Sequence, residues 1–221
     1  KEIVCMNGTY ENIDCMELMA NLKDKEIDLA IVDPEFGIGI AKSARLVTDK
    51  GLKAKNWDDK PINPKYFSEL FRVSKNQIIW GGNYYSLPPT KHCVIWDKKQ
   101  PEKLSFGMFD FAWTSFETSN KIFYHPVVDG SIKIHPTQKP VKLYEWLLTN
   151  YAKPNDLILD THCGSASSLI ACENLGFKYI ASELDKDYYS QSLQRLETHL
   201  AQGKLFQRSG ATEFKEVNLF E

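Results

Sequence analysis

Hydrophobic and polar positions predict strands and helices that alternate along most of the chain. Short apolar runs that stop at polar residues predict buried strands at 28–32, 77–80, 92–96, 157–160 and 179–181, with a weaker strand near 3–4. Apolar positions three or four residues apart predict helices at about 14–19, 64–73, 140–151, 168–175 and 186–201. Asn7-Gly8 is typical of a turn, and the aromatic segment 100–134 predicts short strands around 111–116 and 121–124. This alternation indicates an α/β fold.

Composition favours one soluble α/β domain with insertions, because 221 residues with 43% hydrophobic and 25% charged residues can bury one core. No apolar run reaches the length of a transmembrane helix, and the first residues lack a signal-peptide pattern. The five cysteines form no C-x-x-C pair and have no histidine at metal spacing, so we expect reduced thiols in a cytoplasmic protein without a metal site. The net charge of −2 does not decide whether nucleic acid binds.

The segment Val32–Gly37 ends the most apolar strand and gives the first sign of chemistry. Asp33 supplies a carboxylate at the edge of a sheet, Pro34 supplies a carbonyl without an N–H, and Phe36 supplies a flat apolar face. Two acceptors beside a stacking surface suit a planar ring that bears an amino group. A strand followed by an ordinary Asp-Pro turn is the alternative interpretation of this segment alone.

Residues 157–183 predict a strand, a small-residue turn, a helix and a second strand. Only a small residue such as Gly164 allows the backbone of that turn to approach a ligand closely. Glu183 ends the second strand about 20 residues on, where an acid binds the ribose hydroxyls of an adenosine. The turn lacks the G-x-G-x-x-G pattern, which disfavours NAD and favours a nucleoside ligand without phosphates, such as S-adenosylmethionine.

Three motifs resemble those of amino-directed DNA methyltransferases. The residues at 33–36 resemble that family's Asp-Pro-Pro-Tyr/Phe motif, and the residues at 160–168 resemble its Asp-Pro-Phe-Cys-Gly-Ser-Gly-Thr-Thr turn. The residues at 135–140 read His-Pro-Thr-Gln-Lys-Pro and match the sequence that precedes the family's cofactor strand. The catalytic motif comes first and the cofactor turn last, as in the permuted β class, and the resemblance runs from about Asn7 to Ala201.

The resemblance implies a Rossmann-like S-adenosylmethionine-dependent fold with circularly permuted motif order and a small DNA-recognition insertion. It divides one methyltransferase domain into a catalytic half at about 1–98, a recognition insertion at about 99–134, a cofactor half at about 135–202 and a polar tail at about 203–221. Within the family the chain looks like the compact adenine-directed enzymes of phages and mobile elements. The implied partners are double-stranded DNA and a second copy of the chain.

The resemblance also implies roles for single residues. The catalytic set is Asp33, Pro34 and Phe36. The residues implied in cofactor binding are Asp14, Cys15, Asp33, His135, Thr137, Lys139, Asp160, Cys163, Gly164, Ser165, Ala166, Ser167 and Glu183. Within this set, Asp14 and Cys15 match the segment against the cofactor's adenine, and Lys139 matches a residue able to pair with the cofactor's carboxylate.

A polar segment follows the catalytic motif and carries the basic residues Lys42, Arg45, Lys50, Lys53 and Lys55 against one acid, Asp49. Beside a nucleobase site, these residues are expected to form a loop that contacts DNA phosphates. An ordinary solvated loop is the alternative interpretation.

Methyl transfer to adenine is the activity expected of the whole chain, and three departures from the family pattern bear on it. Glu35 stands where a second proline is usual, Ala166 replaces a glycine and His162 replaces a phenylalanine. An opening Asp favours adenine, whereas Ser is commoner in the cytosine-directed proteins. Transfer to cytosine N4, an inactive homologue that binds DNA or cofactor, and an enzyme acting on RNA or on a glutamine side chain remain alternatives.

Overall fold

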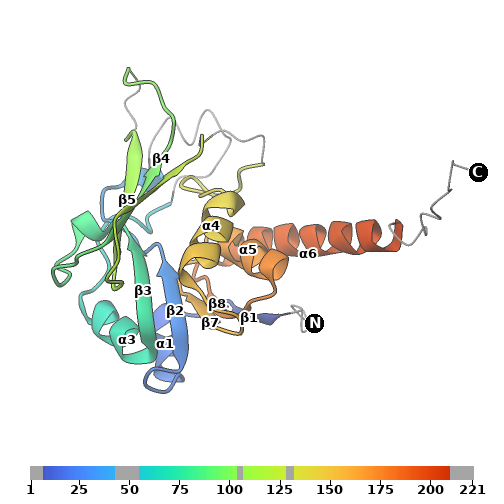
Figure 1. Cartoon of the computed structure of the whole chain (residues 1–221), viewed down its shortest axis with the longest axis horizontal. Helices are drawn as coiled ribbons and strands as arrows, with labels where there is room; N and C mark the ends of the chain where they lie inside the picture. Colours follow the sequence, from blue (N-terminus) through green and yellow to red (C-terminus); the bar gives the residue numbers. More distant parts are fainter. Residues whose placement is uncertain (1–6, 43–54, 104–106, 128–131, 210–221) are drawn as a thin grey trace, which may run out of the picture.

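The computed structural model describes residues 7–42, 55–103, 107–127 and 132–209, and these form an α/β fold around one mixed sheet (Figure 1). The strands are β1 (Gly8–Glu11), β2 (Ile27–Val32), β3 (Ser74–Trp80), β4 (Cys93–Asp97), β5 (Phe109–Thr114), β6 (Lys121–Tyr124), β7 (Leu157–Asp160) and β8 (Lys178–Ser182). The helices are α1 (Cys15–Ala20), α3 (Lys65–Val73), α4 (Val141–Tyr151), α5 (Ser167–Leu175) and α6 (Lys186–Ser209), with 3-10 turns η1 (Ile40–Lys42) and η2 (Gly82–Tyr84).

The strand order is β1-β8-β7-β2-β3-β5-β4-β6. The first five of these strands are parallel, whereas β5 runs antiparallel to both β3 and β4, and β6 is parallel to β4. Because β2 and β7 are parallel neighbours, the segments that follow Val32 and Asp160 emerge at the same edge of the sheet. That edge, at the carboxyl ends of parallel strands, is where open α/β sheets bind ligands.

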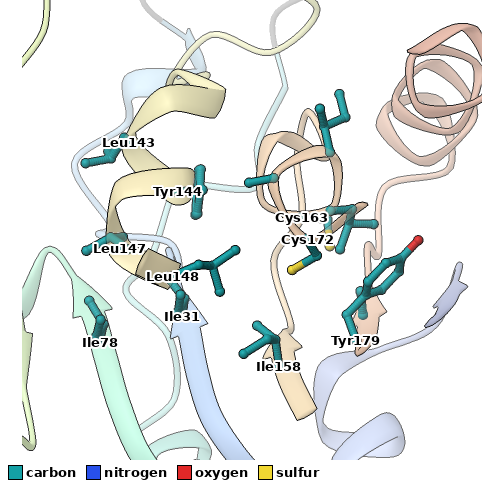
Figure 2. Close-up of a cluster of buried hydrophobic side chains, with 14 of the residues drawn as sticks. Ile31, Ile78, Leu143, Tyr144, Leu147, Leu148, Ile158, Cys163, Cys172 and Tyr179 are labelled. Carbon is teal, nitrogen blue, oxygen red and sulfur yellow. The ribbon is translucent and has the colours of Figure 1, made fainter. Parts of the chain in front are cut away.

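Helices cover both faces of the sheet, which explains why the central parallel strands β2 and β7 are mostly apolar. Leu29 and Ile31 of β2 belong to the buried cluster formed with α4 and α5, whereas Ala30 and Val32 belong to the cluster formed with α1 and α3. Figure 2 shows the first cluster, in which Leu147 and Leu148 of α4 lie toward Ile31 and Ile78, and Cys172 of α5 lies on the side of Ile158 and Tyr179. Burial on both faces fixes the register that delivers Asp33 to the sheet edge.

Most predicted elements are confirmed within two or three residues, and the exceptions have physical reasons. The turn predicted at Asn7-Gly8 is wrong, because Gly8 begins β1 and a Cβ there would lie 2.2 Å from the Tyr179 carbonyl oxygen. The last helix continues past the predicted end at Ala201 to Ser209. The strand predicted near residues 3–4 lies outside the described residues.

Two further observations bear on the chain as a whole. In the part of the chain that the structure describes, no helix is both long enough and apolar enough to cross a membrane. The described cysteines, Cys15, Cys93, Cys163 and Cys172, are free thiols, and Cys5 lies outside the described residues.

Candidate active site

A cavity of about 520 Å³ opens at the edge of the sheet where β2, β7 and β8 end. The predicted residues that line it are Asp14, Cys15, Asp33, Pro34, Phe36, His135, Thr137, Lys139, Cys163, Gly164, Ser165 and Glu183. Asp160, Ala166 and Ser167 do not line it; they lie buried beneath the turn that does. Three motifs that are up to about 130 residues apart in the sequence therefore meet around one cavity.

Asp33 has one engaged and one unengaged carboxylate oxygen at this cavity. Its Oδ2 accepts a hydrogen bond from Nζ of Lys139, a side chain only 4% exposed. Its Oδ1 is buried and has no hydrogen-bond partner among the residues that the structure describes. Burial raises the pKa of Asp33, and the Lys139 ammonium opposes that rise. The pairing of Lys139 with the cofactor's carboxylate, which the resemblance implies, stays a prediction; in the structure Lys139 pairs with Asp33.

The Pro34 carbonyl is held in place by a tyrosine that sequence reasoning missed. The hydroxyl of Tyr85 donates to the Pro34 oxygen at 2.9 Å and lies 3.3 Å from the Glu35 oxygen. Burial raises the pKa of Tyr85, so the phenol stays protonated and remains a donor. A carbonyl oxygen has two lone pairs, so Pro34 retains acceptor capacity beside Asp33.

Phe36 lies flat in a site made by residues that follow β3. Its ring stacks on Tyr84 at a centroid distance of 4.9 Å and an interplanar angle of 14°. Gly81 makes room for it, since a Cβ at that residue would lie 2.1 Å from the ring and the φ of Gly81 is +70°. No signal in the sequence paired Gly81 with Phe36, because the contact joins segments 45 residues apart.

A buried aspartate orders the segment that follows Phe36. Both oxygens of Asp58, which is fully buried, accept backbone N–H groups, from Gly37 at 2.7 Å and from Ile40 at 2.9 Å. The backbone carbonyl of Asp58 accepts a third bond, from the N–H of Gly39. Asp58 therefore fixes the backbone of the loop between the catalytic motif and the basic segment. Nothing in the sequence indicated this role.

The turn after β7 and the acid after β8 are joined directly. Oε2 of Glu183 accepts the N–H of Gly164 at 2.8 Å, and Oε1 accepts the N–H of Asp185 at 2.8 Å. Burial raises the pKa of Glu183, while these two backbone bonds oppose the rise. The carboxylate is thus oriented at the cavity wall, with further lone pairs available for a ligand.

Beneath the same turn, Asp160 accepts bonds from the N–H of His162 and the hydroxyl of Ser168. Burial raises the pKa of Asp160 to about 6. Ala166 has a φ of +57°, a left-handed conformation that favours glycine. The substitution of glycine by alanine here therefore carries a backbone strain of about 1 kcal/mol.

Aromatic side chains close one side of the cavity. The ring of His135 lies between Trp57, at a centroid distance of 5.3 Å, and Tyr188, at 4.4 Å. Burial and the nearby Lys139 lower the pKa of His135 to about 3, so this imidazole is neutral at pH 7. Its Nδ1 lies 3.2 Å from the hydroxyl of Thr137. The sequence identified His135 and Thr137 but not Trp57 or Tyr188.

Asp14 is the N-cap residue of α1. Asp14 Oδ1 accepts the N–H of Met16 at 2.8 Å, and Asp14 and Cys15 both line the cavity. Among the described residues, no group of three or more His, Cys, Asp or Glu side chains is arranged to hold a metal ion.

The described ends of the basic segment are paired with acids of the protein itself. Lys42 binds Asp59 at 2.6 Å, and Lys55 binds Asp185 at 2.5 Å and Asp187 at 3.0 Å. Lys55 thereby ties the end of this segment to the start of α6. Arg45, Lys50 and Lys53 lie outside the described residues, and phosphate contact by the segment stays a prediction.

Comparison with known proteins identifies the family. Residues 50–194, about two thirds of the chain, match the family model for N6/N4 enzymes described as DNA methylase. The chain belongs to the N6/N4 DNA methylase family. It is 36% identical over 202 residues to the type II methyltransferase M2.DpnII of Streptococcus pneumoniae, covering 86% of this chain and 72% of that protein. It is 22% identical over 241 residues to the type II methyltransferase M.HpaI of Haemophilus parainfluenzae, covering 90% and 74%.

Solved structures of DNA methylases share the fold of this N6/N4 DNA methylase family member. A complex of M1.HpyAVI with S-adenosylmethionine matches with a TM-score of 0.59 at 20% identity, covering 85% of this chain and 99% of that one. The PvuII cytosine-N4-specific DNA methyltransferase matches with a TM-score of 0.60 at 14% identity, covering 89% and 92%. The eight-stranded mixed sheet is thus that of known DNA methyltransferases.

Proposed function

We propose that this chain transfers a methyl group from S-adenosylmethionine to the exocyclic amino group of adenine in a short site of double-stranded DNA. The observation that carries this proposal is the unengaged Oδ1 of Asp33, which is buried beside the Pro34 carbonyl in a cavity that Gly164 and Glu183 also line. A buried acceptor without a partner is rare in folded proteins and indicates a missing donor. The N–H groups of an amine would supply it.

The residues around the cavity fit the proposed cofactor. Glu183 presents an oriented carboxylate suited to two ribose hydroxyls, and Asp14 and Cys15 lie where the adenine is expected. His135 and Thr137 lie beside the turn at 163–165, against the expected amino-acid end. When bound, S-adenosylmethionine supplies a methyl group attached to a positively charged sulfur.

The protein's task in the proposed reaction is to make a poor nucleophile reactive. The lone pair of an exocyclic amine is delocalised into its ring. Asp33 Oδ1 and the Pro34 oxygen would each accept one N–H, which holds the nitrogen and favours tetrahedral geometry with its lone pair directed at the methyl group. Both acceptors also stabilise the positive charge that develops on that nitrogen, and its proton leaves afterwards.

A second cavity of about 950 Å³ adjoins the first and supports DNA as the substrate. Phe36 and Lys139 line both cavities, and residues of the proposed recognition segment at 99–134 line the second. Aromatic and basic side chains gather there, including Trp96, Lys98 and Phe109. A base stacked in a duplex cannot bring its amino group into an enclosed cavity, so the target base must flip out of the stack, and Phe36 offers it a stacking face.

Adenine is proposed as the target because the catalytic motif opens with Asp33 rather than with Ser. Cytosine N4 is the second candidate, since the PvuII enzyme of the same fold is cytosine-N4-specific. We assign the chain to the permuted β class, in which homodimers are usual, and place it with the compact enzymes of mobile elements. The type II methyltransferases among its relatives support a role in restriction-modification.

One experiment tests activity, base and site together. The purified protein is incubated with unmethylated genomic DNA and S-adenosylmethionine, and the nucleosides are then separated by mass spectrometry and the DNA sequenced with modified-base detection. N6-methyladenine at one short sequence is the expected result. N4-methylcytosine in its place would show that cytosine is the target base. If neither methylated base forms although S-adenosylmethionine binds, the chain is an inactive homologue.

A further inference from the structure

Two of the three departures from the family pattern lie against each other. Glu35 replaces the second proline of the catalytic motif and His162 replaces the phenylalanine of the cofactor turn, 127 positions later. Nε2 of His162 lies 3.3 Å from Oε2 of Glu35. The contact follows from the topology, because these residues come shortly after β2 and β7, which are neighbouring parallel strands.

Each of these departures alone would be unfavourable at this site. A glutamate without a partner would bring a second, partly buried negative charge next to Asp33. A histidine without a partner would leave a polar ring in a site suited to a phenyl group. The side chains are only 26% and 21% exposed, so neither is fully hydrated, and together they form a pair that satisfies both.

The surroundings of His162 fix its ring in the orientation that reaches Glu35. Nδ1 lies 2.9 Å from the hydroxyl of Thr161, which in turn lies 2.6 Å from the hydroxyl of Tyr66 on α3. The edge of the imidazole also packs against the Tyr66 ring, at a centroid distance of 5.3 Å and an angle of 75°. Burial opposes the charged form of His162, but Cys15 and Glu35 beside it raise its pKa above the usual range. Burial likewise opposes the charged form of Glu35, and His162 outweighs it and lowers the pKa of Glu35.

We infer that Glu35 and His162 form a latch that fixes the catalytic loop to the cofactor turn, and that both are positioning residues for methyl transfer. The latch replaces the restraint that a second proline would give the backbone after Pro34. Its physical effect is to hold the Pro34 carbonyl and Asp33 at a set distance from the bound methyl donor. This inference rests on the proposed function for its effect on turnover, but not for its effect on folding.

A double-mutant cycle tests the latch. Glu35→Met and His162→Phe each remove one partner and leave the other polar group unpaired, whereas the double variant places two apolar side chains against each other. Each single variant should lower kcat about tenfold, the effect of losing one hydrogen bond to a charged group, with the KM for S-adenosylmethionine changed less than about threefold. The double variant should recover to within about threefold of the wild-type kcat.

Two further variants separate positioning from general damage. His162→Gln keeps an N–H that can donate to Glu35, so its kcat should stay within about threefold of the wild type. Glu69→Met breaks a comparably exposed ion pair with Arg72 on α3, away from the cavity, and should leave kcat unchanged. A double variant whose loss equals the product of the two single losses would overturn the latch, because the two side chains would then act independently.

The thermal midpoints of the same four proteins keep the latch testable whatever the activity. If the wild type binds S-adenosylmethionine but transfers no methyl group, the proposed function fails, and the cycle is then evaluated on unfolding alone. A double variant more stable than the sum of the single effects supports the latch. Additive midpoints overturn it.

Discussion

Lys139 and Asp33 lie 106 residues apart in the sequence and form an ion pair at the centre of the candidate active site. The lysine precedes α4 and the aspartate follows β2, so the pair exists only in the folded chain. The ammonium keeps a buried carboxylate closer to its ionised form and occupies one of its two oxygens. In the proposed reaction, the other oxygen is the one left for the amine.

The first prediction concerns Asp33 itself. Asp33→Asn should abolish methyl transfer, because an amide cannot supply the same anionic acceptor, while S-adenosylmethionine and DNA affinity stay within a few-fold. Transfer is measured with tritiated cofactor, and binding by calorimetry. Retained turnover in this variant would refute the assignment of Asp33.

Removal of the whole carboxylate adds a test of the ion pair. Asp33→Ala leaves the Lys139 ammonium buried without a counter-charge, which should lower the free energy of unfolding by about 3 kcal/mol. Adding Lys139→Met to that variant should restore much of the stability but none of the activity. If the double variant were no more stable than Asp33→Ala, the two side chains would not be coupled.

The second prediction is a shift in the pH dependence of turnover. Burial raises the pKa of Asp33 and the charge of Lys139 lowers it, so Lys139→Met should raise that pKa further. Since the ionised carboxylate is the proposed acceptor, the acidic limb of the kcat profile should move to higher pH, by about one to two pH units. Lys142→Met is the matched control, because Lys142 is exposed and pairs with Glu145. Superimposable profiles for the wild type and Lys139→Met would contradict the pairing.

Local chemistry explains which features the sequence could predict. Asp14 caps α1 by accepting the N–H of Met16, two residues later in the chain. Asp33 directly follows β2, whose apolar residues are consecutive in the sequence. Such features depend on residues a few positions apart. The Asn7-Gly8 turn was wrong for the same reason, because a dipeptide preference contains no information about the Tyr179 backbone that excludes a side chain at Gly8.

Contacts between distant segments could not be predicted from residue types alone. Tyr85 donates to the Pro34 carbonyl and Asp58 holds the backbone of Gly37, but a lone tyrosine or aspartate in a loop has many possible partners. The motif at 135–140 did indicate Lys139, which lines the candidate site. Its bond to Asp33 depends on where α4 and β2 lie relative to each other, which only the fold determines.

The third prediction concerns the hydroxyl of Tyr85. Tyr85→Phe removes the donor that fixes the direction of the Pro34 carbonyl, so kcat should fall about fivefold to tenfold while S-adenosylmethionine affinity is unchanged. Tyr84→Phe is the control: it also loses a hydroxyl but keeps the ring that stacks on Phe36. Single-turnover rates of both variants are compared with the wild type. Equal rates for all three would show that the carbonyl needs no such support.

The fourth prediction separates cofactor binding from chemistry. The Glu183 carboxylate accepts two backbone N–H groups, so in Glu183→Gln the amide nitrogen must face one of these donors. The amide group is also a poorer acceptor than the carboxylate for ribose hydroxyls. Titration calorimetry should show S-adenosylmethionine affinity reduced about tenfold or more, with kcat at saturating cofactor within a few-fold of the wild type. Glu197→Gln, at an exposed residue of α6, should change neither quantity. If Glu183→Gln bound S-adenosylmethionine as tightly as the wild type, Glu183 would not be a cofactor-binding residue.

The fifth prediction is a change of stability with pH that originates at Asp160. Burial raises its pKa from 3.8 to about 6, so folding takes up a proton between these values. Asp160 therefore favours the folded state most below about pH 4, and this contribution is lost as the pH rises through 6, a change on the order of 3 kcal/mol. In Asp160→Asn the group does not titrate, and the amide can still accept from the N–H of His162 and donate to Ser168.

Urea unfolding at pH 4, 5, 6 and 7 measures this difference between the wild type and Asp160→Asn. The other buried carboxylates, Asp33 and Glu183, titrate in both proteins and largely cancel in the comparison. The wild type should lose stability relative to the variant as the pH rises from 4 to 7, with most of the change between pH 4 and pH 6. Curves that stay parallel over this range would show that Asp160 is ionised throughout, and that its two hydrogen bonds outweigh its burial.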